Sequence, residues 1–287
     1  MKGSSVEVLI GGFRTKQLPN TCDDNFGSSI VMHCGAMLLC IGTNNIQKCL
    51  LLDRGTWREH STLNEKRYLH SAVSTETATF LFGGTDSATY EYLPKDSSTW
   101  LMGKSNIPGN GKPTYFGFWK GFAIYVKSEQ TIWLIGGSET MRRILSFNVY
   151  DHTFQALPIK LNVARSGHRC AFIPNTNKIM ITGGESLRGY LDSTEILDVE
   201  DGSVIMANPM NFKRTEHGIS VITINGEDRL AVFGGLRLES RTRVDLDSVE
   251  LYNTQTQKWE MTDFKLSDPK FGFGFATVKL TDIISRI

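Results

Sequence analysis

Short apolar runs that end in two glycines recur along the whole chain. Five such doublets each close a run of Val, Ile, Leu, Phe or similar residues. The doublets begin at Gly11, Gly83, Gly136, Gly183 and Gly234. A sixth run ends in the degenerate pair Gly42-Thr43. Successive first glycines lie 31 to 53 residues apart, and self-similarity at such a period indicates a repeat architecture.

Other features keep phase with the glycines. The pattern Arg-x-x-His precedes three of the apolar runs, as Arg67/His70, Arg165/His168 and Arg214/His217. A second β-type run follows each doublet, and an aromatic residue comes after it at Trp57, Trp100, Phe154 and Trp259, with Val204 in this place once. Each unit therefore predicts four short strands separated by turns, without a long amphipathic helix.

Each residue type has a physical reason. A second strand that neighbouring sheets enclose must be apolar on both faces. Two glycines at its end allow positive φ and a close approach to the adjacent sheet, which a Cβ would obstruct. A large aromatic side chain fills the wedge between sheets that diverge from an axis. The arginine before the first strand is expected to bind turn carbonyls or acidic residues of a neighbouring sheet.

These units resemble the kelch-repeat family, whose repeats carry Gly-Gly after the second strand and an aromatic residue in the fourth. The resemblance covers nearly the whole chain. It implies an all-β fold, a six-bladed kelch β-propeller with one four-stranded sheet per blade. Five of the predicted blades span roughly residues 27–60, 67–102, 113–157, 165–208 and 214–262.

The predicted ring is closed by a blade built from both termini, residues 1–25 and 270–287. The chain opens on a second-strand pattern, Val6–Ile10, and finishes on a first-strand pattern, Lys270–Lys279. Pairing the two leaves no exposed sheet edge, so a single domain over residues 1–287 is expected. The short interval after Gly11 predicts a truncated third or fourth strand within Thr15–Asn25.

Composition narrows the range of functions. The 287 residues include 31 basic and 30 acidic side chains, a formal net charge of +1, so no bulk field attracts nucleic acid or a membrane surface. No apolar run is long enough to span a bilayer, and no signal peptide is evident. A cytoplasmic location is therefore expected.

The five cysteines, an odd number without Cys-x-x-Cys spacing, predict neither a disulfide framework nor a zinc site. Three of them, Cys34, Cys40 and Cys49, fall in one predicted blade. This grouping is typical of close packing or of a redox contact. Buried free cysteines that act as small apolar side chains are the simpler interpretation.

A search for catalytic motifs finds no nucleophile elbow, phosphate loop or zinc-protease helix. The sequence therefore predicts a protein that is not an enzyme and carries no cofactor or metal. One alternative stays open. His70, His168 and His217 occupy equivalent positions on inner strands, where they would serve a metal-dependent enzyme or small-molecule binder in the axial channel. In the other interpretation, each imidazole satisfies the same backbone group of its own blade.

Propellers bind ligands on the face formed by the second-to-third strand loops and the loops entering each inner strand. In kelch adaptors, the residue after the first-strand arginine is a frequent partner contact. The resemblance transfers this role to Tyr68, Ser166 and Thr215, and in the degenerate repeats to Phe271, Phe26 and Trp119. Aromatic anchors near arginines are typical interface hot spots, although the same aromatic residues would also serve to pack strand ends.

Two long loops follow doublets, at residues 185–192 and 236–247. Arginines on these loops are suited to bidentate recognition of acidic groups on a partner. They are Arg188, Arg237, Arg241 and Arg243. A solvated loop is the other interpretation.

The predicted function is a non-catalytic module that binds a partner protein or peptide on this loop face, without nucleic acid or membrane. The kelch resemblance implies a substrate-recognition part of a cullin-type ubiquitin ligase or a scaffold complex. A second alternative from the same resemblance is an actin-binding structural protein. The ligase role needs a BTB domain, which the sequence lacks, so either a domain of a longer protein or a stand-alone adaptor is expected.

Overall fold

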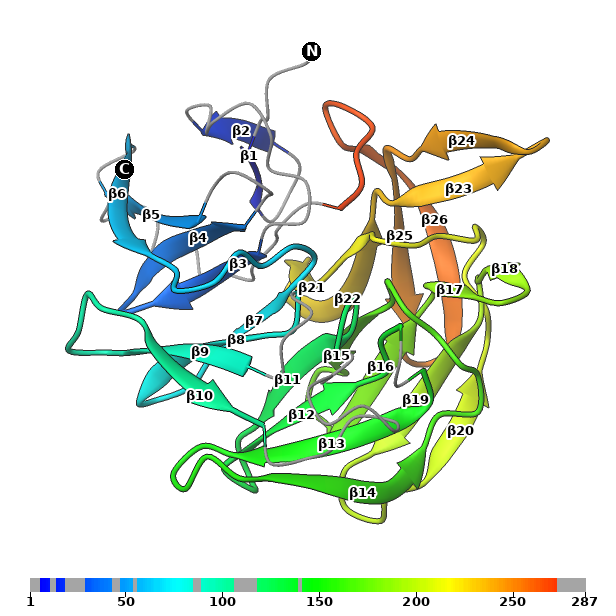
Figure 1. Cartoon of the computed structure of the whole chain (residues 1–287). Coiled ribbons are helices and arrows are strands. Elements are labelled where there is room, and N and C mark those ends of the chain that lie inside the picture. The colour runs from blue at the N-terminus through cyan, green and yellow to red at the C-terminus, as the bar shows by residue number, and fades with distance from the viewer. Residues whose placement is uncertain are drawn as a thin grey trace.

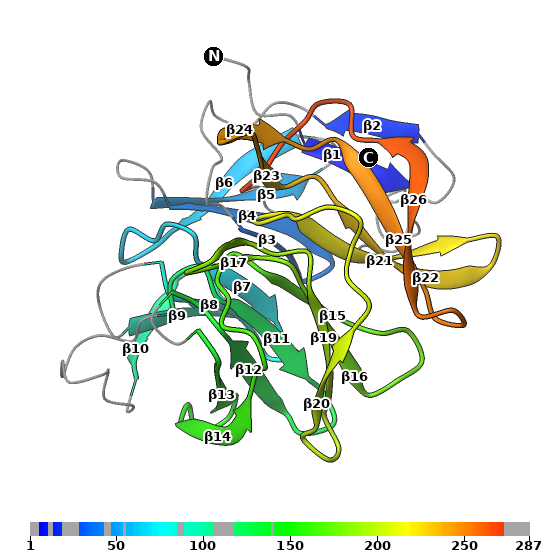
Figure 2. The same ribbon diagram turned by 90° about the vertical axis from the view of Figure 1, so that its right-hand side faces the viewer.

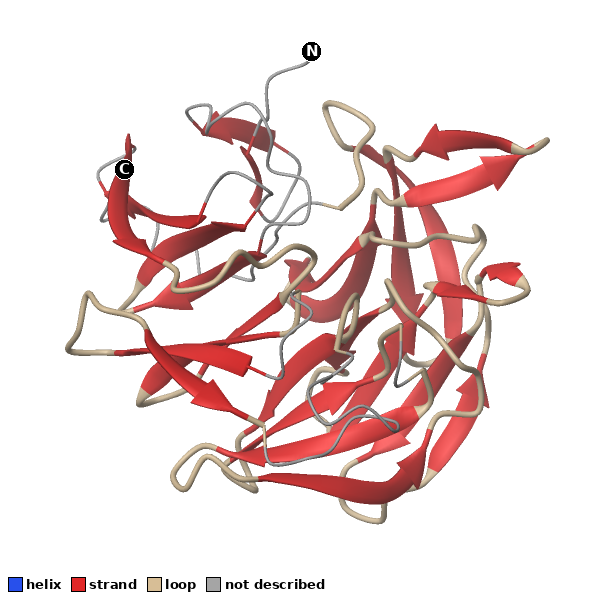
Figure 3. Cartoon of the chain, viewed as in Figure 1, coloured by secondary structure: helices blue, strands red, loops and turns tan. Residues whose placement is uncertain are grey.

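The computed structural model describes residues 6–10, 14–18, 29–42, 47–53, 56–84, 89–105, 118–138 and 141–272. Figure 3 shows strands joined by turns and loops, and these ranges contain no helix. No helix in the described part of the chain is therefore long and apolar enough to cross a membrane. The protein has an all-β fold, as predicted.

Most strands belong to five antiparallel sheets of four strands, here named blades I to V in chain order. Blade I contains β3 (Ser29–His33), β4 (Ala36–Gly42), β5 (Gln47–Asp53) and β6 (Thr56–Thr62). Blade II contains β7 (Ser71–Ser74), β8 (Ala78–Phe82), β9 (Thr89–Pro94) and β10 (Leu101–Lys104). Blade III contains β11 (Phe122–Val126), β12 (Thr131–Ile135), β13 (Arg143–Asn148) and β14 (Phe154–Lys160). Blade IV contains β15 (Arg169–Phe172), β16 (Lys178–Thr182), β19 (Thr194–Asp198) and β20 (Val204–Ala207). Blade V contains β21 (Gly218–Ile224), β22 (Glu227–Phe233), β25 (Ser248–Asn253) and β26 (Lys258–Lys265).

The blades follow one another around a common centre, which makes the fold a β-propeller (Figure 1). Their first strands are innermost, and β3, β7, β11, β15 and β21 contact one another in that order. A separate pair, β1 (Val6–Ile10) and β2 (Arg14–Leu18), lies between blades I and V in both ribbon views (Figures 1 and 2).

The number of complete blades differs from the prediction. The described residues form five four-stranded blades, not six. At the place predicted for the sixth, they form only the two-stranded sheet of β1 and β2. The segment predicted to complete that blade, Lys270–Lys279, lies outside the described residues after Gly272.

The second strand of each blade supplies the core. Every residue of β8 is buried, and β12 and β16 are buried from their second residue onward. Apolar side chains on both faces of these strands pack against two neighbouring blades at once. This burial confirms the interpretation of the apolar runs as sheltered strands.

The glycine doublets occur where the backbone leaves no room for a side chain. Gly83 and Gly184 have φ of +72° and +94°. A Cβ on Gly83 would lie 1.8 Å from the carbonyl oxygen of Phe118, and one on Gly184 would lie 2.5 Å from that of Ser166. The contact at Gly83 is made to the turn that enters the next blade, and the contact at Gly184 is made to the turn that enters its own blade. The expected close approach to the adjacent sheet is therefore confirmed at Gly83, and Gly184 shows a second close approach within one blade.

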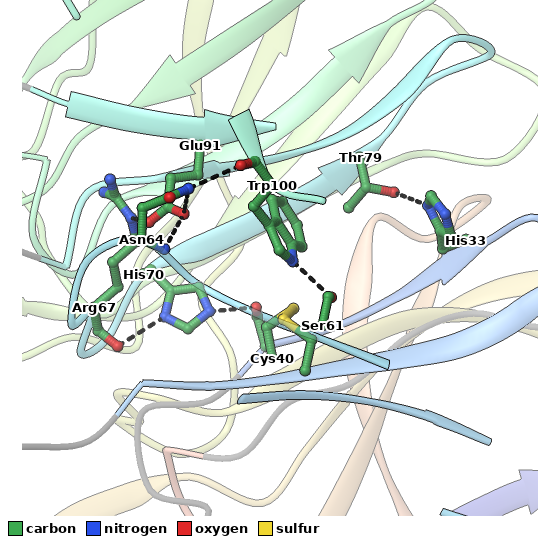
Figure 4. The surroundings of a disulfide bond; sticks show 11 residues. His33, Cys40, Ser61, Asn64, Arg67, His70, Thr79, Glu91 and Trp100 are labelled. Carbon is green, nitrogen blue, oxygen red and sulfur yellow. Dashed lines mark hydrogen bonds and ion pairs between the residues drawn. A yellow bond between two sulfur atoms is a disulfide. The ribbon is translucent and has the colours of Figure 1, made fainter. Parts of the chain in front are cut away.

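The outer aromatic residues fill the wedges between blades, as predicted. Trp100, Phe154 and Trp259 are all buried. The Trp100 ring packs with Leu38 and other residues of blade I, and its Nε1 donates a hydrogen bond to Ser61 Oγ there (2.9 Å; Figure 4). Each of these rings therefore links two sheets that would otherwise separate toward the rim.

The repeated arginines are buried and bind within their own blade, which corrects the expectation of a neighbour. Arg67 Nε donates to Glu91 Oε1 (2.8 Å), and its Nη1 donates to the carbonyl of Gly83 (3.0 Å). Glu91 also accepts the backbone N–H of Asn64 (2.7 Å; Figure 4). The equivalent networks are Asn162, Arg165 and Glu195 in blade IV, and Asn211, Arg214 and Glu250 in blade V.

Blade I contains a disulfide that the sequence did not predict. Cys40 on β4 faces Cys49 on β5, their Cα atoms are 4.1 Å apart, and their sulfur atoms are bonded (Figure 4). Both side chains are fully buried among Leu38, Leu81 and Trp100. The expectation of buried free cysteines was therefore wrong for this pair, because the register of a hairpin places two cysteines nine residues apart opposite each other. It was also wrong for Cys34, which is exposed at the turn between β3 and β4.

Candidate partner-binding face

A continuous series of backbone hydrogen bonds around the centre joins the turns that lead into the inner strands of blades II to V, and ends at Gly272. The N–H of Lys120 donates to Leu69 (3.4 Å), that of Gly167 to Lys120 (2.8 Å), that of Glu216 to Gly167 (2.8 Å) and that of Gly272 to Glu216 (2.9 Å). These five residues, here called the axial ring, all have φ between +53° and +63°. They are therefore equivalent positions of successive blades, and they mark one end of the propeller.

The axial ring fixes the correspondence of the residues just before it. Trp119 in blade III is equivalent to Tyr68, Ser166, Thr215 and Phe271. Blade III lacks the arginine that locates this position in blades II, IV and V. Its backbone shows the equivalence directly, since the carbonyl of Trp119 accepts the N–H of Ser138 (2.8 Å) as that of Ser166 accepts the N–H of Glu185 (2.7 Å).

Two of the predicted aromatic residues come together on this face. The ring centroids of Tyr68 and Trp119 are 6.4 Å apart. Trp119 Nε1 donates to the carbonyl oxygen of Tyr68 (3.1 Å), which fixes the indole although it is 39% exposed. Burial, and then the negative charge of Glu216, raise the pKa of Tyr68, so the phenol stays neutral. The pair thus presents a fixed aromatic surface.

A charge cluster of buried Glu216 and half-buried Lys120 and Glu185 lies beside these aromatics. Lys120 Nζ is 2.8 Å from Glu185 Oε1 and 2.8 Å from Glu216 Oε1. Burial lowers the pKa of Lys120, but the two carboxylates raise it by more, so the ammonium is retained. The Lys120 ammonium also lies 5.7 Å from the centroid of the Trp119 ring. One cation therefore links three blades at the centre of the face.

The other residues predicted from the first-strand position differ in exposure. Ser166 and Thr215 are buried, and each forms an isolated antiparallel bridge, to Glu185 and Leu236 respectively. Their side chains are poorly placed to touch a partner unless neighbouring side chains move. Phe271 is half-buried. Phe26 lies outside the described residues.

The two long loops are β-hairpins that project from the same end of the propeller (Figure 1). They are β17 (Glu185–Ser186) with β18 (Gly189–Tyr190), and β23 (Leu236–Glu239) with β24 (Thr242–Asp245). Arg188, Arg241 and Arg243 on these hairpins are exposed. Arg237 is half-buried, stacks on Phe212 at 4.8 Å and donates to Glu239 (3.0 Å), so it is already engaged.

The three repeated histidines lie between blades and do not converge. His70 Nε2 is 2.7 Å from Ser29 Oγ of blade I, and His217 Nε2 is 2.8 Å from Thr182 Oγ1 of blade IV. His168 packs under Gly136 of blade III. Burial lowers the pKa of all three, so the imidazoles are neutral. Among the described residues, no three His, Cys, Asp or Glu side chains group as metal ligands would.

The charge cluster of Lys120, Glu185 and Glu216 was not among the predicted site residues. The prediction used the first residue after each arginine, whereas Glu216 and Lys120 occupy the axial-ring position, which is the second. A comparison of Leu69, Gly167 and Glu216 in the three Arg-x-x-His motifs would have flagged a charged residue where another repeat has glycine. No sequence signal indicates that Lys120 and Glu185 reach it.

The chain matches no known protein-family model, and no curated protein matches it at a significant level. The fold and the face described above therefore define the class of the protein, a β-propeller, on structural grounds alone.

Proposed function

We propose that this chain is a six-bladed kelch-type propeller and acts as a non-catalytic module that binds a partner protein or peptide on the face around the axial ring. The observation that carries the proposal is the exposed indole of Trp119, held against half-buried Tyr68 and beside the charge cluster of Lys120, Glu185 and Glu216. Rigid aromatic side chains next to paired charges are typical centres of protein interfaces, because they bury much area at little entropic cost.

The kelch assignment rests on the repeat itself. Paired glycines with positive φ and the Asn–Arg–Glu network recur in phase through blades II, IV and V. Buried outer aromatic residues recur in blades II, III and V. The position of β1 and β2 between blades I and V supports a sixth blade there (Figure 2). A blade that joins both termini would remove the last open edges of the ring.

The two projecting hairpins extend the proposed surface. Exposed Arg188, Arg241 and Arg243 favour a partner with acidic groups toward the rim of blades IV and V. Exposed Leu187 and Leu238 stand on the same hairpins and offer apolar contacts beside them. By resemblance to kelch adaptors, such a partner would be a substrate or scaffold component in the cytoplasm.

The test is an affinity capture from cell lysate with quantitative mass spectrometry, comparing the whole chain with a Tyr68→Ala/Trp119→Ala variant. Proteins retained by the wild type and lost from the variant are the expected result. Tyr150→Ala is the matched control, because Tyr150 is 68% exposed at the opposite end of blade III. Equal capture by all three proteins, with unchanged thermal unfolding, would contradict the proposed face.

A further inference from the structure

Only one of the two carboxylate oxygens of buried Glu216 has a bonding partner. The residue is 4% exposed, and its Oε1 binds the ammonium of Lys120. Its other oxygen, Oε2, is buried and has no hydrogen-bond partner. A buried charged oxygen without a donor is costly, so this arrangement needs a reason.

Neighbouring positive charge does not supply the missing bond. Arg169 on β15 is close enough for Glu216 to raise its pKa against the lowering effect of burial. No hydrogen bond nevertheless reaches Glu216 Oε2. Lys120 divides its bonds between Glu216 and Glu185, so two carboxylates share one ammonium.

The backbone at Glu216 shows that the site is maintained against a cost. Glu216 and Lys120 have φ of +53° and +57°, the left-handed region that favours glycine. Among the equivalent axial-ring positions, Gly167 and Gly272 adopt this backbone freely, and Leu69 has φ of +56°. Charged residues stand at the two positions that form the ion pair, although glycine would fit both at less cost, and such backbone strain is typical of functional sites.

The aromatic side of the site already accepts a cation. The Lys120 ammonium lies against the Trp119 ring, and Trp119 is held by Tyr68 and open to solvent. An aromatic face next to an unsatisfied carboxylate matches the requirements of an ammonium or guanidinium group.

We propose that a partner segment places a lysine or arginine side chain against Trp119 and donates from it to Glu216 Oε2. The side chain of Lys120, which is 18% exposed, moves aside to admit it. This inference rests on the proposed function and specifies its chemistry: the partner is a peptide segment with a basic residue at the centre of its contact.

The test is a selection from a random 12-residue peptide library on phage, with the immobilised whole chain. We expect the enriched peptides to share Lys or Arg at one aligned position. One synthetic peptide from the selection is then measured by calorimetry. Binding to Glu216→Gln should be about 10-fold weaker or more, the usual effect of losing a hydrogen bond to a charged group. Glu227→Gln is the matched control and should bind like the wild type, because Glu227 is the exposed first residue of β22 at the far end of blade V.

A second measurement does not depend on the folding of any variant. Replacing the shared arginine of the peptide by citrulline, its neutral isostere, or a shared lysine by norleucine, should weaken binding to the wild type by a similar factor. Enriched peptides that are lost with Trp119→Ala but share no basic residue would overturn this inference and leave the proposed function intact. Failure to enrich any Trp119-dependent peptide would contradict both.

Discussion

The Arg214–Glu250 pair of blade V allows a quantitative test of what holds each blade. Both side chains are fully buried, and Arg214 Nη2 donates to Glu250 Oε1 (2.6 Å). Glu250 also accepts from the backbone N–H and the side-chain amide of Asn211 (2.7 and 2.9 Å). The carboxylate therefore ties the entering turn of the blade to β25.

Glu250→Gln keeps the shape of the side chain and removes its charge. Arg214 remains buried, and burial already lowers its pKa against the raising effect of Glu250. Breaking one partner of a buried pair costs about 3–5 kcal/mol. At roughly 2 °C per kcal/mol for a chain of this size, we expect Tm to fall by about 6–10 °C.

The assay is thermal unfolding followed by circular dichroism at one scan rate. Glu260→Gln on the neighbouring strand β26 is the control, because Glu260 pairs with Arg229 at the surface (2.7 Å), where such pairs contribute about 1 kcal/mol or less. The double variant Arg214→Met/Glu250→Gln should unfold at a higher temperature than Glu250→Gln, since no charge is left uncompensated. Equal Tm values for Glu250→Gln and Glu260→Gln would refute the reasoning.

Three further predictions follow from burial and backbone geometry. Gly184→Ala should lower the Tm by more than Gly226→Ala. Both glycines have positive φ, but only at Gly184 would a Cβ meet backbone atoms. Equal losses of Tm would show that φ alone decides the cost. Burial lowers the pKa of His70 to about 4, so below pH 6.5 the unfolded chain binds a proton that the folded chain does not. This group should therefore lower the free energy of unfolding by up to about 1.4 kcal/mol per pH unit as pH drops toward 4. Between pH 7 and 5, the Tm of His70→Gln should depend less steeply on pH than that of the wild type. Parallel plots of Tm against pH for the two proteins would contradict this. In the native protein, iodoacetamide should label exposed Cys34 faster than Cys170, because Cys170 is buried and burial raises its pKa. The two labelling rates are measured by peptide mass spectrometry. Equal rates would contradict the described packing.

The fold was predictable where one residue type has one physical task. Apolar second strands, glycines with positive φ and wedge-filling aromatics each leave a local pattern, and the structure confirms them. Only the arginine of the Arg–Glu network was identifiable in the sequence. Its partner was not, because Glu91 lies 24 residues after Arg67 and belongs to a strand of mixed composition. The arginine was therefore identified, but its partner was assigned to a neighbouring sheet.

The candidate site was predictable only in part, because its geometry depends on distant turns. Tyr68 and Trp119 were selected from the repeat, and the structure brings them together. The charge cluster depends on Lys120 meeting Glu185 and Glu216, residues that lie 65 and 96 positions further along the chain. A pattern of local spacing contains no information about which axial-ring side chains meet across the centre.

Blade III shows which part of the repeat must stay constant. Phe118 occupies the position of Arg67, and the strand register places Leu145 at the position of Glu91. Both residues are buried in one apolar cluster, so an apolar pair replaces the ion pair, an exchange that the energetics of buried pairs permit. The backbone is unchanged, since Lys120 still joins the axial ring and Gly136 and Gly137 still have positive φ. Backbone geometry and apolar strands therefore specify the propeller, whereas the side chains around the ring are able to differ from blade to blade. Those differences give a nearly symmetric scaffold one asymmetric centre, and this asymmetry would let the partner that we propose bind in a single orientation.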